Sequence, residues 1–384
     1  MKIIVAMDSF KGSLTSLQAG EAVKEGITNA MSDAKVCIRP LADGGEGTVE
    51  ALVSGRNGTL EHLQVTGPLG APIPCTYGIM ENGIKDGKTA VMEMSAAAGL
   101  TLVDRKDRNP LHTTTYGVGE IITDAIAKGC RRFLVGIGGS ATNDGGAGML
   151  QALGFGLLDK NGKQIPPGAK GLKELVTITD TSVIPGLEEC TFRIACDVTN
   201  PLCGADGCSA VFGPQKGATP AMISQMDEWL AHFSALIMKK YAHADAAQAG
   251  AGAAGGLGFA FLSYTHAVLE SGIRIVLEET GLEEDIRTAD LVVTGEGRLD
   301  GQTIFGKAPV GVAQLAKKHG KKVLAFSGCV TEDAAVCNGH GIDAFFPILR
   351  SAQPLQDAMQ PEQAKQNLRA ASEQVFRLIR CLQK

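Results

Sequence analysis

Ile3-Ile4-Val5-Ala6-Met7, an unbroken apolar run, is followed at once by the polar segment Asp8-Ser9-Phe10-Lys11-Gly12-Ser13. A short continuous apolar run is typical of a parallel β-strand that is covered on both faces. Next, Thr15 and Gln18 have the spacing of a capping box, which predicts the start of a helix. Apolar residues at helical spacing then extend to Ala30. The order of strand, loop and helix indicates the repeating unit of an α/β sheet.

The same order recurs along both ends of the chain. A second strand is predicted at 36–41, followed by the loop Ala42-Asp43-Gly44-Gly45-Glu46-Gly47-Thr48 and a short helix to Ser54. In the C-terminal third, strands are predicted at 290–294, 322–326 and 344–348. Helices are predicted from Pro309, in a first turn, to His319 and from Pro361 to Leu382. This alternation predicts a parallel sheet with helices on both faces.

The middle of the chain has a different pattern. Residues 60–105 contain short alternating runs and many turn residues, which predict antiparallel hairpins. From Thr113 the α/β pattern returns, with a helix to Lys128, a strand at 132–137, a loop at 138–148 and a helix to Leu153. We therefore expect an α/β protein with a Rossmann-like parallel-sheet domain split across both termini, residues 1–65 plus 265–384. Residues 66–264 would form an inserted second α/β domain.

Composition excludes several classes of protein. The 384 residues are 44% hydrophobic and carry a net charge of −5, so generic binding to nucleic acid or an anionic membrane is not expected. The sequence has no run of 18 or more apolar residues, so no transmembrane helix is expected. The 10 cysteines form no CxxC pair. They are interpreted as reduced thiols of a cytoplasmic protein.

Five loops that combine polar residues with turn chemistry follow predicted strands. They are Asp8–Ser13, Asp43–Thr48, Gly138–Gly146, Cys196–Pro201 and Gly295–Gln302. Ligands of open α/β sheets bind at the carboxyl ends of strands, where glycines let backbone N–H groups approach phosphate oxygens. Ordinary turn formation would explain any one of these loops. Five of them together favour a binding site for an anionic ligand.

Two segments match the consensus of nucleotide-binding motifs but lack other features that such motifs require. Gly250-Ala-Gly252-Ala-Ala-Gly255 has the pattern G-x-G-x-x-G, but a polar alanine-rich segment precedes it instead of a strand. A flexible loop or a close helix contact is the preferred interpretation. Gly301–Ala308 resembles a P-loop in which Ala308 replaces the hydroxyl residue that would hold Mg²⁺. Lys307, just before a predicted helix, remains a candidate phosphate contact.

Other catalytic arrangements are missing from the sequence. It contains no HExxH zinc motif and no G-x-S-x-G nucleophile elbow. The polar loops do supply many carboxylate oxygens, which suit a hard cation such as Mg²⁺. The residues concerned are Asp43, Glu46, Asp144, Asp197, Glu296 and Asp300.

Together, five motifs resemble those of the bacterial type-1 glycerate kinase family, in the family order. They are Asp8–Ser13, Ala42–Thr48, Gly139–Gly146, Cys196–Leu202 and Thr294–Thr303. The resemblance extends from Met1 to the C-terminal helix. It implies ATP-dependent phosphorylation of D-glycerate, with 2-phosphoglycerate as the favoured product and the 3-hydroxyl as the alternative acceptor. It also implies two α/β domains with the active site in the cleft between them.

Phosphoryl transfer requires charge neutralisation, positioning and a group that accepts the hydroxyl proton. We expect Asp197 to be that base, with Asp43 as the alternative, and Lys11 to act on the phosphates. Arg298 could hold a carboxylate or phosphate with two hydrogen bonds. The other expected contacts to substrate or phosphate are Ser13, Ser140, Thr142, Asn200 and Lys307. The expected Mg²⁺ ligands are Glu46, Asp144, Glu296 and Asp300, although the sequence does not decide which carboxylate has which role.

Two further hypotheses belong to other classes. A non-catalytic sensor of sugar acids or nucleotides would bind without releasing ADP, and the many carboxylates in the loops argue against it. A dehydrogenase would use Gly250–Gly255 to bind NADH. The expected partners are the small molecules D-glycerate and ATP, with no nucleic acid or membrane. Monomer and homodimer both remain open.

Overall fold

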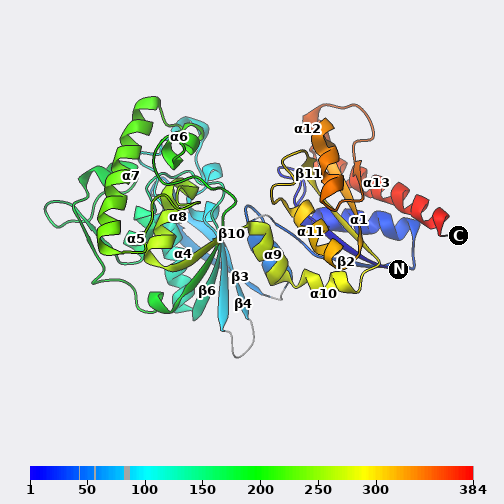
Figure 1. Ribbon diagram of the computed structural model, residues 1–384, viewed down its shortest axis with the longest axis horizontal. Helices are drawn as coiled ribbons and strands as arrows, with labels where there is room; N and C mark the ends of the chain where they lie inside the picture. The colour runs from blue at the N-terminus through cyan, green and yellow to red at the C-terminus, as the bar shows by residue number, and fades with distance from the viewer. Residues whose placement is uncertain (43, 56–57, 82–86, 384) are drawn as a thin grey trace. The chain divides into compact units, whose positions relative to one another are not determined.

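The computed structural model describes residues 1–42, 44–55, 58–81 and 87–383. The chain divides into two compact units (Figure 1). Unit 1 comprises residues 1–43, 50–56 and 273–384, and unit 2 comprises residues 44–49 and 57–272. Each unit is built on its own sheet, and the predicted α/β class is confirmed.

Unit 1 contains a five-stranded parallel sheet in the order β13-β12-β11-β1-β2. Its strands are β1 (Lys2–Met7), β2 (Lys35–Ile38), β11 (Leu291–Leu299), β12 (Lys322–Val330) and β13 (Ala344–Pro347). Counted along this unit, the order is 2-1-3-4-5, that of a doubly wound sheet. The order reverses between β1 and β11, where Met7 is paired with Gly295. Ligands of such sheets bind at the carboxyl ends of the strands at this reversal.

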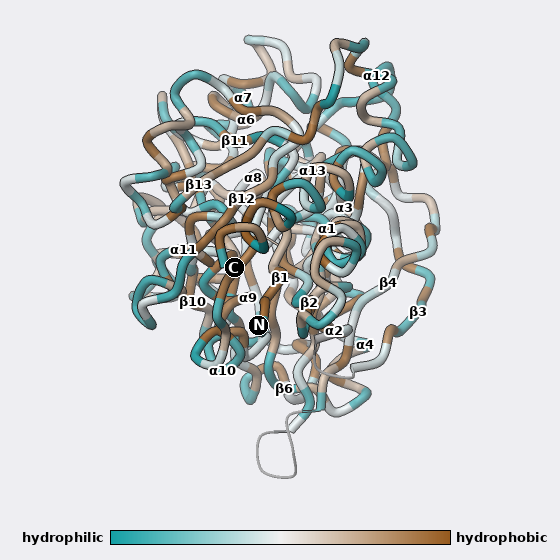
Figure 2. The backbone as a smooth tube through the Cα atoms, turned by 90° about the vertical axis from the view of Figure 1, so that its right-hand side faces the viewer, coloured by the Kyte–Doolittle hydropathy of each residue, from teal (hydrophilic) through white to brown (hydrophobic). Residues whose placement is uncertain are grey.

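The helices of unit 1 cover a strongly apolar sheet. They are α1 (Ser16–Ala30), α9 (Gly272–Thr280), α10 (Leu282–Arg287), α11 (Ala308–Lys318), α12 (Leu355–Ala358), α13 (Pro361–Leu382) and the 3₁₀ helix Glu332–His340, while α2 (Thr48–Gly55) begins in unit 2. The predicted capping box is confirmed, since Gln18 N donates to Thr15 Oγ1 over 3.2 Å and Thr15 N donates to Gln18 Oε1 over 2.9 Å. In Figure 2, β1 and β12 have mainly the colour of hydrophobic residues, as expected for strands in a core.

Unit 2 contains a six-stranded mixed sheet in the order β10-β9-β6-β5-β4-β3. Its strands are β3 (Thr59–Thr66), β4 (Pro72–Glu81), β5 (Lys88–Glu93), β6 (Cys130–Gly136), β9 (Thr191–Ala195) and β10 (His266–Glu270). The pairs β3–β4 and β4–β5 are antiparallel, which confirms the predicted hairpins. The pairs from β5 to β10 are parallel, so their carboxyl ends share one edge.

The remaining elements of unit 2 are mostly short. Its helices are α3 (Ser95–Ala98), α4 (Tyr116–Ala127), α5 (Ala147–Ala152), α6 (Cys208–Phe212), α7 (Pro220–Lys240) and α8 (Ala253–Tyr264), and β7 (Gly156–Leu158) pairs with β8 (Thr177–Thr179). In the described part of unit 2, 3₁₀ helices are at Leu100–Leu102, Arg105–Asp107, Ala169–Glu174, Leu187–Glu189 and Pro214–Lys216. The core includes the stacked rings of Phe133 and Phe192, whose centroids are 4.6 Å apart. No helix in the described ranges is both long and apolar enough to span a bilayer.

Some element borders differ from the predicted ones. Strand β2 ends at Ile38, whereas β11 and β12 continue past their predicted ends to Leu299 and Val330. The sequence did not predict the extension of β11 because Gly295–Leu299 has the composition of a polar loop. In the structure the backbone of this segment pairs with β12, and Leu299 is buried. Strands β3 and β10 both belong to unit 2. Strand β3 begins at Thr59, before the predicted domain border at 66, and the whole of β10 lies after the predicted border at 264.

Candidate functional site

The loop after β1 lies against the second half of β11 at the reversal point of the unit 1 sheet. Asp8 N donates to Gly295 O over 2.8 Å. A Cβ atom added to Gly297 would lie 3.4 Å from Phe10 Cα and 3.6 Å from Lys11 N, so the backbone of the Lys11 loop runs close beside β11. Ser13 Oγ is buried and has no hydrogen-bond partner among the described residues. The structure thus brings the first and the last of the predicted motifs together.

The end of β11 carries a cluster of charged groups. Lys307 Nζ lies 3.3 Å from Asp300 Oδ1 and 3.8 Å from Glu296 Oε2. Thr303 Oγ1 donates to Glu296 Oε1 over 2.8 Å. Arg298 Nε lies 3.3 Å from Asp300 Oδ2, and the Arg298 side chain is 65% exposed. Two carboxylates therefore face a single ammonium group here, with an exposed guanidinium at the rim.

Helix α11 places Lys307 in this cluster. Lys307 is the residue that precedes the first turn, and Pro309 stands in that turn as predicted. The first N–H groups of a helix have no partner within the helix, so they favour anions. The lysine and the helix end can therefore both act on a phosphate.

In unit 2, Asp144 fixes the loop between β6 and α5. Its Oδ2 accepts from Thr115 N and Thr115 Oγ1, each over 2.9 Å, and from Gly148 N over 3.3 Å. Its Oδ1 accepts from Gly146 N over 3.1 Å. Burial raises the pKa of this carboxyl, and these hydrogen bonds oppose the rise. The expected metal role of Asp144 does not fit this geometry, because its oxygens are enclosed and already hold the loop.

Lys216 is a functional candidate that the sequence reasoning missed. Its side chain is buried, and its Nζ donates to Ser140 Oγ over 2.8 Å and to Thr142 O over 2.6 Å. Burial lowers the pKa of Lys216 to about 8. In the sequence Gly213-Pro214-Gln215-Lys216-Gly217, nothing distinguishes this lysine from a solvated one in a turn.

The G-x-G-x-x-G segment supports the same loop from another side. Gly145 N donates to Gly255 O over 2.9 Å. A Cβ atom at Gly255 would lie 2.1 Å from Thr142 O, and Gly255 has a φ of +69°. Ala254, with a φ of 53°, is the one non-glycine residue with positive φ in the described chain. These glycines serve close packing, which agrees with the preferred interpretation from the sequence.

The loop 44–48 lies at the carboxyl edge of the unit 2 sheet. A Cβ atom at Gly44 would lie 2.5 Å from Ala195 Cβ, at the end of β9. Glu93, at the end of β5, accepts from Val49 N over 3.0 Å, and burial raises the pKa of Glu93. Glu93 was also missed by the sequence reasoning. Glu46 is exposed in this loop, and Asp43 lies outside the described residues.

Two more predicted residues follow β9 in unit 2. Asp197 is exposed, and its Oδ1 accepts from Gly272 N over 3.3 Å. Asn200 Nδ2 donates to Asp206 O over 2.8 Å, so this amide closes its own loop. No group of three or more His, Cys, Asp or Glu residues suited to a metal occurs in the described ranges. Among the predicted metal ligands, Glu296 and Asp300 of unit 1 lie together beside Lys307.

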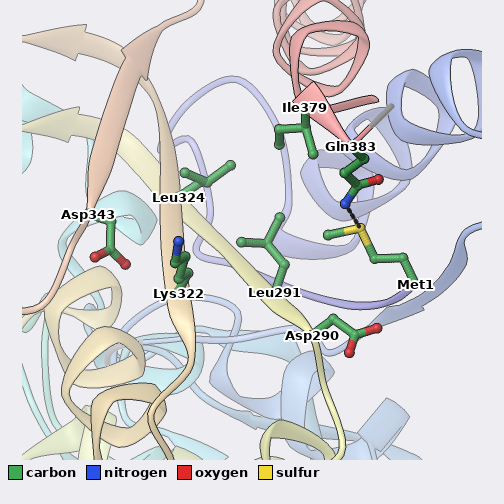
Figure 3. A pocket seen from close by; sticks show the side chains of 8 residues that line it. All are labelled: Met1, Asp290, Leu291, Lys322, Leu324, Asp343, Ile379 and Gln383. Atoms are coloured by element: carbon green, nitrogen blue, oxygen red, sulfur yellow. Dashed lines mark hydrogen bonds between the residues drawn. The ribbon is translucent and has the colours of Figure 1, made fainter. Parts of the chain in front are cut away.

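A pocket of about 540 Å³ lies elsewhere in unit 1. Figure 3 shows its lining residues, which include Met1, Asp290, Lys322 and Asp343. These residues stand at or just before the amino ends of β1, β11, β12 and β13. The pocket is therefore at the edge of the sheet opposite to the charged cluster, and it contains none of the predicted site residues.

Comparison with known proteins gives a consistent result. Residues 3–380 match the glycerate kinase family. The chain is 47% identical to a glycerate kinase of Haemophilus influenzae, covering 99% of each chain. It is 48% identical to a glycerate 2-kinase of Escherichia coli, covering 93% of each chain. A crystal structure assigned as glycerate kinase 2 of Salmonella typhimurium superimposes with a TM-score of 0.90 at 44% identity, covering 100% of this chain and 99% of that one.

Proposed function

The chain belongs to the glycerate kinase family, and we propose that it transfers the γ-phosphoryl group of ATP to the 2-hydroxyl of D-glycerate. The products are 2-phospho-D-glycerate and ADP. The name of the Escherichia coli relative, glycerate 2-kinase, favours the 2-hydroxyl over the 3-hydroxyl. The alternatives of a sensor and of a dehydrogenase are not favoured, because the relatives are named as kinases.

The observation that carries this proposal is the charged cluster at the β1–β11 reversal. Lys307 and the start of α11 supply positive charge and N–H groups for phosphate oxygens. Exposed Lys11 stands on the neighbouring loop. The exposed fork of Arg298 has the geometry to bind a carboxylate or a phosphate with two parallel hydrogen bonds. Such positioning and charge neutralisation are what phosphoryl transfer requires from a protein.

Glu296 and Asp300 fit a Mg²⁺ ion. Both lie within 3.8 Å of the same ammonium, so their carboxylates already converge on one cationic group. Protein Mg²⁺ sites commonly use one or two carboxylates together with substrate phosphates and water. When bound, Mg²⁺ neutralises developing charge on the phosphates. Glu46, exposed in unit 2, stays a further proposed ligand.

Asp197 remains the proposed base in unit 2. Its carboxylate is exposed at the carboxyl end of β9, where it can accept the proton of a bound hydroxyl group. Ser140 and Thr142 remain proposed contacts to substrate or phosphate. The ten free cysteines are in keeping with a reducing, cytoplasmic location, which we also propose.

A coupled assay of ADP release tests the function. Purified protein with ATP and Mg²⁺ is offered D-glycerate, L-glycerate and other small hydroxy acids, and the product is identified by phosphorus NMR. We expect turnover with D-glycerate and a phosphate ester on its 2-hydroxyl. Binding of glycerate or ATP without ADP release would support the sensor instead.

Two lysines at the ends of α11 provide a matched pair of variants, Lys307 just before the helix and Lys317 in its last turn. Lys307 stands before the first turn beside Asp300, and Lys317 stands in the last turn, 2.6 Å from Asp343. Both make an ion pair with an aspartate, but only Lys307 belongs to the cluster. We expect Lys307→Met to lower kcat/KM about 10- to 100-fold, with Lys317→Met close to wild type. Equal effects of the two substitutions would contradict the phosphate role of Lys307.

A further inference from the structure

We propose that Lys216 is a positioning residue that orients the hydroxyl group of Ser140 and holds the glycine loop of residues 138–146 in its active conformation. This inference rests on the proposed function, in which Ser140 contacts substrate or phosphate. Lys216 itself is buried, so we place its action on Ser140 and the loop.

The direction of one hydrogen bond carries the argument. An ammonium group has three donors and no acceptor, so Ser140 Oγ must accept the 2.8 Å hydrogen bond from Lys216 Nζ. The proton of the Ser140 hydroxyl then points elsewhere. Among the described residues the Ser140 hydroxyl donates no hydrogen bond, and Ser140 is 7% exposed. An anionic oxygen of a ligand is the acceptor that this arrangement suits.

The second contact of Lys216 acts on the loop backbone. Its Nζ donates to Thr142 O over 2.6 Å, and the same carbonyl packs against Gly255. Asp144 anchors the following residues through backbone N–H groups. Lys216 thus supplies the attachments at Ser140 and Thr142, beside the hydrogen bonds that Ala141 N and Gly145 N donate to Ala98 O and Gly255 O.

Stability alone does not account for a lysine in this place. Removing an ammonium group from water is costly, and a buried ion pair is often no more stable than well-packed apolar residues. The charged or ionisable groups that act on Lys216 are Asp144, before α5, and Cys208, in α6. A cost of this kind is expected where a charge orients a functional group.

Hydrogen exchange tests the positioning role without any assay of activity. We expect Lys216→Met to increase amide exchange in residues 139–146 at least tenfold, with α4 still protected. The control is Lys128→Met, which removes a half-buried lysine of the same unit that contacts Glu61 and Asp124. It should leave the loop protected. Unchanged exchange of residues 139–146 in Lys216→Met would overturn the proposal, even if the wild type proved inactive on glycerate.

A double-mutant cycle in the ADP-release assay tests whether Lys216 acts through Ser140. We expect Lys216→Met and Ser140→Ala each to lower kcat/KM about 10- to 100-fold, the range of one charge-assisted hydrogen bond. The double variant should lose little more than either single one, because both remove the same oriented hydroxyl. If the loss of kcat/KM in the double variant equalled the product of the two single losses, the residues would have independent roles and the proposal would be overturned. An inactive wild type would refute the proposed function instead. The hydrogen-exchange experiment would then test the positioning role of Lys216 by itself.

A folding failure would not leave the question open. Lys216→Gln retains two N–H donors without the charge and serves as the conservative variant, with kcat/KM expected between those of Lys216→Met and the wild type. If neither Lys216 variant folds, Ser140→Ala in the wild-type background decides. The proposal requires that it lose turnover while its loop stays protected from exchange. Full activity of Ser140→Ala would overturn the proposal.

Discussion

Individual carboxylate side chains in the polar loops have different roles because their surroundings differ. Asp144 is enclosed and accepts four hydrogen bonds, so it holds the backbone. Asp197 is exposed at a strand end. Glu296 and Asp300 converge on Lys307. Asp144 and Asp197 both lie in polar loops after strands. Only their contacts in the structure distinguish Asp144, which anchors its loop, from Asp197, the candidate base.

Asp197→Asn tests the proposed base at this scale. The amide keeps the shape of the side chain and can still accept from Gly272 N, but it cannot take up a proton. We expect kcat to fall about 10²- to 10⁴-fold, with an unchanged melting temperature. Asp206→Asn, an exposed change in the same loop, is the control. A near-normal kcat in Asp197→Asn would transfer the assignment to Asp43.

The titration of Lys216 predicts a pH dependence of stability. Its pKa is lowered from 10.5 to about 8 by burial, so between these values the unfolded chain binds more protons than the folded one. Stability of the wild type relative to Lys216→Met should therefore rise as the pH increases from 8 to 10.5, by up to about 3 kcal/mol. Asp144 and Cys208 are present in both proteins, so their own titration largely cancels. Urea unfolding at several pH values measures the difference, and parallel curves would contradict the prediction.

At the scale of elements, loops depend on close backbone contacts that only glycine permits. The loop of residues 138–146 packs on the left-handed turn at Ala254–Gly256. Likewise, a Cβ atom at Gly136, at the end of β6, would lie 2.3 Å from Gly44 O in the loop of residues 44–48. In both places a glycine matters for what lies beside it, not for local flexibility.

Gly255→Ala tests this packing. The new Cβ atom would lie 2.1 Å from Thr142 O, at a φ of +69°. We expect a loss of about 2–4 kcal/mol in the free energy of unfolding, from overpacking and left-handed strain together. Gly162→Ala is the control, since Gly162 has a φ of +75° but open space around its Cβ position. It should lose only about 1–2 kcal/mol. Similar losses in urea unfolding would refute the packing role.

At the scale of the whole molecule, each sheet carries its own set of polar loops. Unit 1 holds the loops after β1 and β11, and unit 2 holds those after β6 and β9 together with residues 44–48. Substitutions in either set are expected to lower turnover, as the tests of Lys307 and Asp197 examine. The one ion proposed for the reaction is assigned to unit 1.

Removal of Mg²⁺ should therefore stop the reaction without unfolding the protein. With EDTA in excess, we expect ADP release to cease, and added Mg²⁺ should restore it. The melting temperature should stay the same, because the described chain has no cluster of three or more ligands that would make the metal a structural one. Full turnover in EDTA would exclude the proposed role of Glu296 and Asp300.

The sequence by itself determined the features that depend on near neighbours. The apolar run of β1, the capping box of α1, the proline at the start of α11 and the bounds of α13 were all predicted and are confirmed. Each depends on residues a few positions apart, so its signal is local. The five motifs also sufficed to indicate the family, because each is a contiguous stretch.

Only the tertiary structure decided how the motifs are grouped and what each side chain holds. Sheet order places the loop after β1 beside β11, although the two strands are far apart in the chain. Lys216 contacts Ser140 and Thr142 across 76 and 74 positions, and Glu93 contacts Val49 across 44. Burial turns Asp144 from an expected metal ligand into an anchor. Such contacts arise from long-range packing, which leaves no periodicity or spacing for a single sequence to reveal.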